Sequence, residues 1–139
     1  MKILFMCVAN SARSQLAEGL AKTVFPNVEI KSAGSMPGKL NPFAVKAMQE
    51  IGIDISKHYS KSVDELSSEF LVDLNYVITL CAEEVCPILL SRTAKKLHWP
   101  FPDPATKEPL PENELLSRFQ IARDSILDRL NRFKNEISP

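Results

Sequence analysis

The chain has 139 residues, the length of one domain, and its 45% hydrophobic and 24% charged residues are typical of a globular protein. Seventeen basic residues balance seventeen acidic ones, so the net charge gives no field that would hold nucleic acid or an anionic membrane. We therefore expect a single domain over residues 1–139 that has neither of these partners.

The apolar N-terminal run is too short for a signal peptide, because Asn10, Arg13 and Gln15 interrupt it, and no later stretch could span a bilayer. Three cysteines are an odd number. In a reducing compartment, such residues are more often reactive thiols or buried hydrophobes than parts of a disulfide framework. We expect a cytoplasmic protein that acts as a monomer and uses cysteine chemistry.

Strand and helix patterns alternate along the chain. Apolar residues at steps of four place Leu16, Leu20 and Val24 on one face of a helix over residues 14–24. A second helix begins with Asn41 as its N-cap, has proline at its first position and ends before a glycine at position 52. The predicted strands are short and comprise residues 2–7, 28–33, 75–80 and 97–101.

A further helix is predicted over residues 63–71, and the last one covers residues 115–137, where apolar residues recur at three or four residue steps. Five prolines, at positions 100, 102, 104, 109 and 111, exclude a helix over residues 100–111. The alternation favours a doubly wound α/β fold, with a four-stranded parallel sheet flanked by helices. Functional groups in such folds lie at the carboxyl ends of the strands, where Cys7 and Cys81 fall.

A cysteine and an arginine, separated by five residues, lie between the first strand and the first helix. A loop of this length can wrap a tetrahedral oxyanion with backbone N–H groups, while the helix N-terminus adds positive potential. Cys7 would attack as a thiolate, and the planar guanidinium of Arg13 would grip two anion oxygens. The alternative, a buried structural cysteine, leaves Arg13 unexplained. The predicted oxyanion-binding residues are Val8, Ala9, Asn10, Ser11, Ala12, Arg13 and Ser14.

Two residues of this loop have supporting roles. Ser14 can donate its hydroxyl to the Cys7 sulfur, and Asn10 tolerates the left-handed backbone that such loops need.

The loop resembles that of the low-molecular-weight protein tyrosine phosphatases and of the thioredoxin-coupled arsenate reductases built on the same fold. The shared motif is Cys-x5-Arg-Ser, followed here by Gln-Leu-Ala-Glu-Gly, although Ala9 stands where these families usually have glycine. The resemblance extends over nearly the whole chain, through residues 32–34, 41–42, 54–56, 79–89, 95–99 and 103–105.

Cys81 and Cys86 resemble the redox segment of the arsenate reductases, which a phosphatase does not need. Reduction of arsenate takes two electrons, so the first thiol needs a partner that resolves its arsenic adduct. The resemblance implies that Cys7 attacks arsenate, that Cys81 attacks the Cys7 adduct and releases arsenite, and that Cys86 then attacks Cys81. Thioredoxin would reduce the Cys81 to Cys86 disulfide, and phosphate or sulfate would mimic arsenate.

Asp103 precedes a proline in the proline-rich loop, where both families place the acid that protonates the leaving oxygen. The resemblance implies that Asp103 is this general acid, although an aspartate before proline often only shapes a turn. Ala105 and Thr106 follow, where the phosphatases carry aromatic residues that line a phosphotyrosine pocket.

The resemblance implies no required cofactor. Some related reductases bind a potassium ion, and the matching residues here are Asn10, Glu18, Ser32 and Asp64, although such polar residues usually only form hydrogen bonds. Zinc held by the cysteines with His58 or His98 is disfavoured, because the spacing lacks a Cys-x2-Cys knuckle.

The sequence therefore predicts an arsenate reductase with a Cys7, Cys81 and Cys86 relay. One alternative is a phosphatase that hydrolyses phosphomonoesters through a phosphocysteine at Cys7, with Arg13 and Asp103 in the same roles. Another is a non-enzymatic thiol sensor, which would form a disulfide with peroxide and need no oxyanion. The physiological reductant also stays open between thioredoxin, a glutaredoxin and another thiol.

Overall fold

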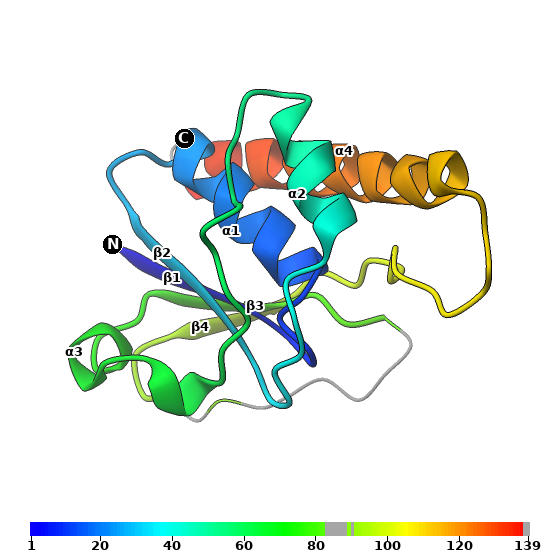
Figure 1. Ribbon diagram of the computed structural model, residues 1–139. Coiled ribbons are helices and arrows are strands. Elements are labelled where there is room, and N and C mark those ends of the chain that lie inside the picture. Colours follow the sequence, from blue (N-terminus) through cyan, green and yellow to red (C-terminus); the bar gives the residue numbers. More distant parts are fainter. Residues whose placement is uncertain (83–88, 90, 138–139) are drawn as a thin grey trace.

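The computed structural model describes residues 1–82, 89 and 91–137, and it contains one parallel sheet with helices on both faces (Figure 1). Its strands follow the order β2-β1-β3-β4, so β1 and β3 are central. This arrangement confirms the predicted fold class. The strands are β1 (Lys2–Cys7), β2 (Glu29–Gly34), β3 (Tyr76–Thr79) and β4 (Lys95–His98).

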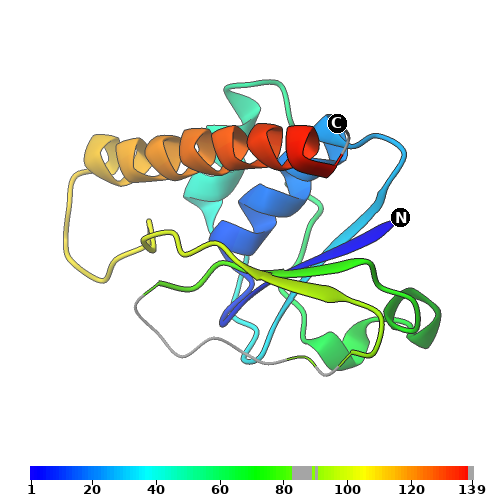
Figure 2. The same ribbon diagram turned by 180° about the vertical axis from the view of Figure 1, so that it is seen from behind.

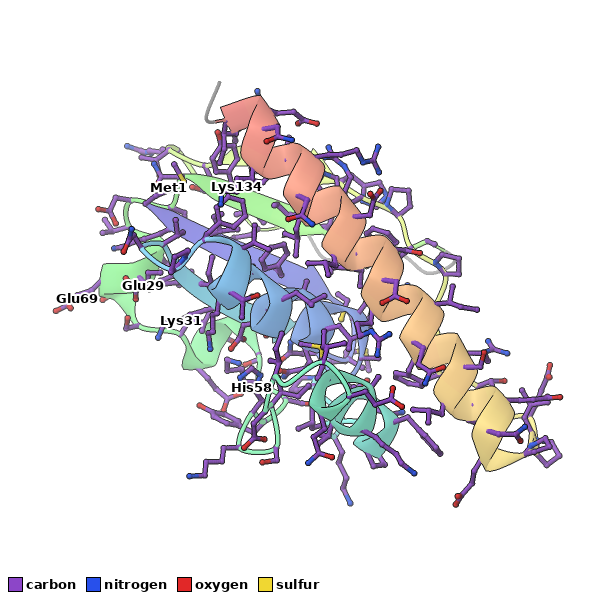
Figure 3. The ribbon with its side chains drawn as sticks, turned by 90° about the horizontal axis from the view of Figure 1, so that it is seen from above. Met1, Glu29, Lys31, His58, Glu69 and Lys134 are labelled. Atoms are coloured by element: carbon purple, nitrogen blue, oxygen red, sulfur yellow. The ribbon has the colours of Figure 1, made fainter. Side chains whose placement is uncertain are left out.

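Helices α1 (Arg13–Val24), α2 (Pro42–Gln49) and α4 (Glu112–Ile137) form a layer on one face of the sheet, and α4 packs on both of the others. Helix α3 (Ser68–Leu71) lies on the opposite face, as the front and back views show (Figures 1 and 2). Seen from above, α4 crosses the sheet obliquely beside α1 (Figure 3). Among the described residues, no helix has the length and apolarity that a bilayer crossing requires.

The main core lies between the sheet and this helical layer, and the predicted apolar stripe of α4 forms part of it. Phe133 is fully buried there and makes edge-on ring contacts with Phe25, Tyr76 and Trp99, at centroid distances of 6.0, 5.0 and 5.2 Å. Such contacts add to the hydrophobic gain of burying a ring. One residue therefore joins α4 to α1 and to the sheet.

The helix predicted over residues 63–71 is wrong as a continuous element. The structure has a 3-10 helix, η1 (Val63–Glu65), and the separate helix α3. Ser67 has extended backbone angles, and its hydroxyl accepts a hydrogen bond from the Phe70 N–H at 3.2 Å. A serine N-cap marks the start of a new helix. Ser67 therefore begins α3 as a separate helix and does not continue η1.

The last strand was predicted over residues 97–101 but covers Lys95–His98. It therefore starts two residues earlier than predicted and stops three residues earlier. Strand β4 pairs only with β3 in the sheet and is an edge strand, so it can carry the exposed residues Lys95 and Lys96. Apolar patterning does not reveal the polar start of such a strand. The strand ends at His98, shortly before Pro100, which has no N–H to donate.

Three segments leave the same edge of the sheet at the carboxyl ends of the strands. Met6 is in register with Thr79, and the Leu80 N–H donates to the Met6 carbonyl at 3.0 Å. The Phe101 N–H in turn donates to the Leu80 carbonyl at 3.2 Å. The segments that follow Cys7, Leu80 and Phe101 therefore emerge beside one another.

Phe133→Ala should lower the free energy of unfolding by about 3 to 5 kcal/mol, because it removes a buried ring and leaves a cavity. The matched control is Ile121→Ala on the same helix, where a side chain that is 64% exposed should matter by no more than about 0.5 kcal/mol. Urea unfolding of both variants measures the difference. Equal midpoints for the two would contradict the packing described for α4.

Candidate active site

A cavity of about 140 Å³ opens between the end of β1 and the start of α1. Its lining combines the predicted nucleophile, most of the predicted oxyanion loop, the arginine and the acid from the proline-rich segment. These residues are Cys7, Val8, Ala9, Ser11, Ala12, Arg13 and Asp103. The fold thus joins residues that are nearly one hundred positions apart in the sequence, and the cavity suits a small tetrahedral anion.

The Cys7 sulfur lies 2.9 Å from the Ser14 hydroxyl oxygen, and both side chains are buried. The Asn10 side-chain amide donates to the same hydroxyl oxygen at 2.7 Å. That oxygen accepts a hydrogen bond from Asn10, and its own O–H can still donate to the sulfur. The Ser14 hydroxyl is thus placed to donate a hydrogen bond to the Cys7 sulfur.

Asn10 shapes the loop, and it has the predicted left-handed backbone, with a φ of 51°. Its amide also donates to the Ser32 hydroxyl at 3.0 Å. Its side-chain oxygen accepts from the Gln15 amide and from the Lys61 N–H, each at 3.1 Å. A fully buried side chain with four such bonds fixes the loop in one conformation.

Gly34 ends β2 directly beside the loop, a role that sequence reasoning did not assign. A β-carbon at this position would overlap the Val8 carbonyl oxygen and would lie 3.0 Å from the Asn10 nitrogen. Both obstacles are backbone atoms, which cannot rotate away. Only glycine therefore allows the loop to pack this closely on β2. The Ser-Ala-Gly sequence at the end of a strand was the available signal.

Arg13 and Asp103 face each other across the cavity. The Arg13 Nη2 atom lies 3.8 Å from the Asp103 Oδ2 atom, and Arg13 Nη1 donates to the Phe101 carbonyl at 3.0 Å. The other carboxylate oxygen of Asp103 accepts from the Ala105 N–H at 3.0 Å. The turn therefore holds Oδ1, while Oδ2 points to the place where an anion would sit beside Arg13.

Cys81 follows β3 and is buried, and it is disulfide-bonded, whereas Cys7 is a free thiol. Cys81 directly follows Leu80, and the Leu80 N–H donates to the carbonyl of Met6, the residue before Cys7. Cys86 lies outside the described residues, so its predicted role stays a prediction.

Glu18 is a buried carboxylate on α1 behind the loop. It accepts hydrogen bonds from the Ser32 hydroxyl at 2.6 Å and from the Lys22 ammonium at 2.7 Å, and Lys61 lies 3.7 Å away. Burial alone would raise its pKa, but these bonds and the lysine charges leave the pKa of Glu18 below its usual 4.5. The carboxylate is therefore charged at neutral pH.

His58 connects this carboxylate to the loop. Its ring lies 3.6 Å from Glu18 and 3.0 Å from the Gln15 side-chain oxygen. Burial lowers the pKa of His58, with the neighbouring lysines acting in the same direction. His58 and Lys31 both lie on the side of α1 away from α4 (Figure 3). His98 is elsewhere, on β4, where its ring nitrogen bonds the Thr79 hydroxyl at 2.8 Å.

The predicted potassium residues are only partly brought together. Asn10, Glu18 and Ser32 share one hydrogen-bonded network, but Asp64 lines a different cavity, beside Met6 and Gly34. In that network the Asn10 and Glu18 oxygens already accept hydrogen bonds, and two lysines balance the carboxylate. The set therefore fits a potassium ion poorly, because a metal would have to displace these donors. Potassium binding stays a prediction.

With this geometry established, comparison with known proteins identifies the family. The family model described as low molecular weight phosphotyrosine protein phosphatase matches residues 2–137. The chain belongs to this family. Membership confirms the resemblance drawn from the Cys7 loop and accounts for a sheet, a loop and an acid arranged as described above.

Named relatives within this phosphatase family are arsenate reductases. The arsenate reductase of Bacillus subtilis is 43% identical over 134 residues, which are 94% of this chain and 93% of the relative. A solved arsenate reductase in the phosphate binding state superposes with a TM-score of 0.75 at 28% identity, covering 99% of this chain and 98% of that one. A thioredoxin-dependent arsenate reductase of Corynebacterium glutamicum has a TM-score of 0.60 at 26% identity, covering 94% and 61%.

Gly34→Ala should abolish tight oxyanion binding, because the new methyl group would force the Val8 carbonyl and the whole loop to shift. Phosphate binding measured by calorimetry tests this expectation. The matched control is Gly38→Ala, whose β-carbon would have an ordinary contact of 3.7 Å with the Ala9 side chain. Unchanged phosphate affinity in Gly34→Ala would show that the loop tolerates the shift.

Glu18→Gln should lower the free energy of unfolding most near neutral pH. A carboxylate with a depressed pKa stabilises the folded state above its unfolded pKa, and this contribution is lost as the pH falls through the folded pKa. The difference between wild type and variant should therefore shrink below about pH 4.5. Urea unfolding at several pH values measures it, and a difference independent of pH would contradict the ionised, lysine-paired state of Glu18.

Proposed function

We propose that the chain reduces arsenate to arsenite, with Cys7 as the nucleophile and Cys81 as the thiol that resolves the adduct. One observation carries the proposal: a small cavity holds Cys7, Arg13 and Asp103, and a second cysteine capable of forming a disulfide leaves the same edge of the sheet. The arsenate reductases among the relatives support the same reaction.

The first step forms a bond between the Cys7 sulfur and arsenic(V). Arsenate occupies the cavity, its oxygens are bound by the guanidinium of Arg13 and by the loop, and the thiolate of Cys7 attacks the arsenic atom. One arsenic–oxygen bond breaks. The Asp103 carboxyl gives its proton to the departing hydroxyl group of arsenate, which leaves as water. No electrons are transferred to arsenic at this stage.

The second step is the reduction. The thiolate of Cys81 attacks the Cys7 sulfur, a disulfide bond forms and the arsenic–sulfur bond breaks. The electron pair of that bond stays with arsenic, which becomes arsenic(III) and leaves as arsenite. Two thiols have lost two electrons in total, which balances the reduction.

The third step regenerates Cys7. The thiolate of Cys86 attacks Cys81, so Cys7 is released as a thiolate and the oxidised pair is Cys81 with Cys86. A dithiol protein of the thioredoxin class then reduces this pair by disulfide exchange. The thioredoxin-dependent relative supports that class of reductant. The disulfide-bonded state of Cys81 beside a free Cys7 is compatible with this last oxidised form.

Phosphatase activity is the second candidate, because the family itself is named for it. Phosphomonoester hydrolysis would use Cys7, Arg13 and Asp103 in the same cavity. It gains nothing from Cys81, and the residues after Asp103 here are Pro104 and Ala105, not an aromatic platform. We therefore expect any phosphatase activity to be secondary.

Arsenate reduction coupled to thioredoxin should fall to the background rate in Cys81→Ser and in Cys86→Ser, because each variant lacks one sulfur of the relay. Hydrolysis of a small aryl phosphate should survive both changes, whereas Cys7→Ser should lose both activities. Parallel steady-state assays of the four proteins measure these outcomes. The surviving phosphatase activity serves as the control that the variants are folded.

Reductase activity that survives Cys81→Ser would contradict the relay. Wild-type protein that hydrolyses phosphate esters but does not reduce arsenate with any dithiol donor would favour the phosphatase candidate.

A further inference from the structure

We infer that Arg118, on helix α4, is a positioning residue that holds the Asp103 carboxyl over the oxyanion cavity. Its guanidinium donates to the Pro104 carbonyl at 3.0 Å through Nε and to the Asp103 carbonyl at 3.4 Å through Nη2. The inference rests on the proposed function, since it concerns the acid used in the first step.

The segment that carries Asp103 has few backbone hydrogen bonds of its own. Residues 100, 102 and 104 are prolines and have no N–H to donate. The Phe101 N–H reaches the Leu80 carbonyl at a long 3.2 Å. In the part of the chain that the structure describes, side chains therefore hold this segment in place of a regular ladder.

Two arginines from different helices hold the segment. Arg13, at the start of α1, binds the Phe101 carbonyl, and Arg118, from α4, binds the carbonyls of Asp103 and Pro104. A guanidinium can contact two neighbouring carbonyls at once because its N–H groups form a planar fork. Together these bonds fix the backbone on both sides of the Asp103 side chain.

The direction of the Asp103 carboxyl follows from this backbone. Its Oδ1 atom is bound to the Ala105 N–H at 3.0 Å, so the side chain cannot rotate independently of the turn. The Oδ2 atom then lies 3.8 Å from Arg13. Any shift of the turn that Arg118 holds would therefore move the proton donor with respect to the bound anion.

Arg118 itself has a rigid support. It precedes Phe119, which is fully buried and stacks on Phe43 of α2 at a centroid distance of 6.0 Å. Arg118 also lines a cavity of about 240 Å³ with apolar walls that include Phe101 and Ala122. Apolar surroundings limit competition from water for its hydrogen bonds.

The expected kinetic effect is selective, because Arg118 contacts carbonyl groups and not the anion site. Arg118→Met should lower kcat for arsenate by roughly 10-fold to 100-fold, the effect of a small displacement of a catalytic group. KM for arsenate should stay within about twofold, since Arg13 still binds the substrate. Arg118→Lys should recover part of kcat, because an ammonium can still donate to one carbonyl.

A double-mutant cycle with Asp103→Asn tests whether Arg118 acts through Asp103. In the Asp103→Asn background the acid is already absent, so Arg118→Met should cause no further loss of kcat. The matched control is Arg123→Met on the same helix. Arg123 donates to the Ala47 carbonyl of α2 at 2.8 Å, which is the same kind of bond to a helix that does not carry the acid. This control should lower the unfolding midpoint and leave kcat unchanged.

Wild-type kcat in Arg118→Met, or an equal loss of kcat in the Asp103→Asn background, would overturn the inference, as would an equal effect of Arg123→Met. Failure of the wild-type protein to reduce arsenate would instead contradict the proposed function. In that event the same cycle is measured with an aryl phosphate, whose hydrolysis needs the same acid, so the role of Arg118 is still decided.

Discussion

The buried side chain of Asn10 is the interaction on which the rest of the site depends. The loop must turn its backbone inward around an anion, and this requires one residue in a left-handed conformation that strands and helices never supply. Asn10 provides that conformation. The hydrogen bonds of its side-chain amide hold α1, β2 and the segment near Lys61 against the loop. The same amide also donates to the Ser14 hydroxyl that lies 2.9 Å from the Cys7 sulfur. One buried group therefore both supports the loop and holds the serine beside the cysteine.

The topology explains why the remaining parts meet at this loop. Because β1 and β3 are adjacent and parallel, the segments after them leave the sheet at the same edge, which places Cys7 near the start of the Cys81 segment. The chain returns through β4 beside β3, and the proline-rich segment then reaches back toward α1. The nucleophile, the redox cysteine and the acid thus lie at or after the ends of three different strands, β1, β3 and β4. No single stretch of sequence contains all three.

Local patterns predicted the fold class and all four strands, although the bounds of the last one were wrong. They also predicted most of the cavity lining, because the Cys7 loop is a contiguous motif with a specific spacing. The local patterns failed where tertiary contacts set the bounds of an element or the role of a residue. The edge strand β4 begins with two exposed lysines, so apolar patterning placed its start two residues too late. The N-cap at Ser67 divides a segment that was predicted as one continuous helix. Neither Gly34 nor Arg118 could be assigned a role, since one acts by lacking a side chain beside Val8 and the other through carbonyls. The catalytic roles and the extent of the domain stay predictions.

Strand β4 also has a consequence for how copies of the protein behave when crowded. An edge strand presents unpaired backbone groups that invite another sheet to add on, a common start of aggregation. Here Lys95 and Lys96 are both exposed along that edge. A second copy approaching through the same strand would bring lysine against lysine, and this repulsion discourages sheet extension. The lysines that hid the start of this strand from pattern-based prediction thus help the molecules to stay separate.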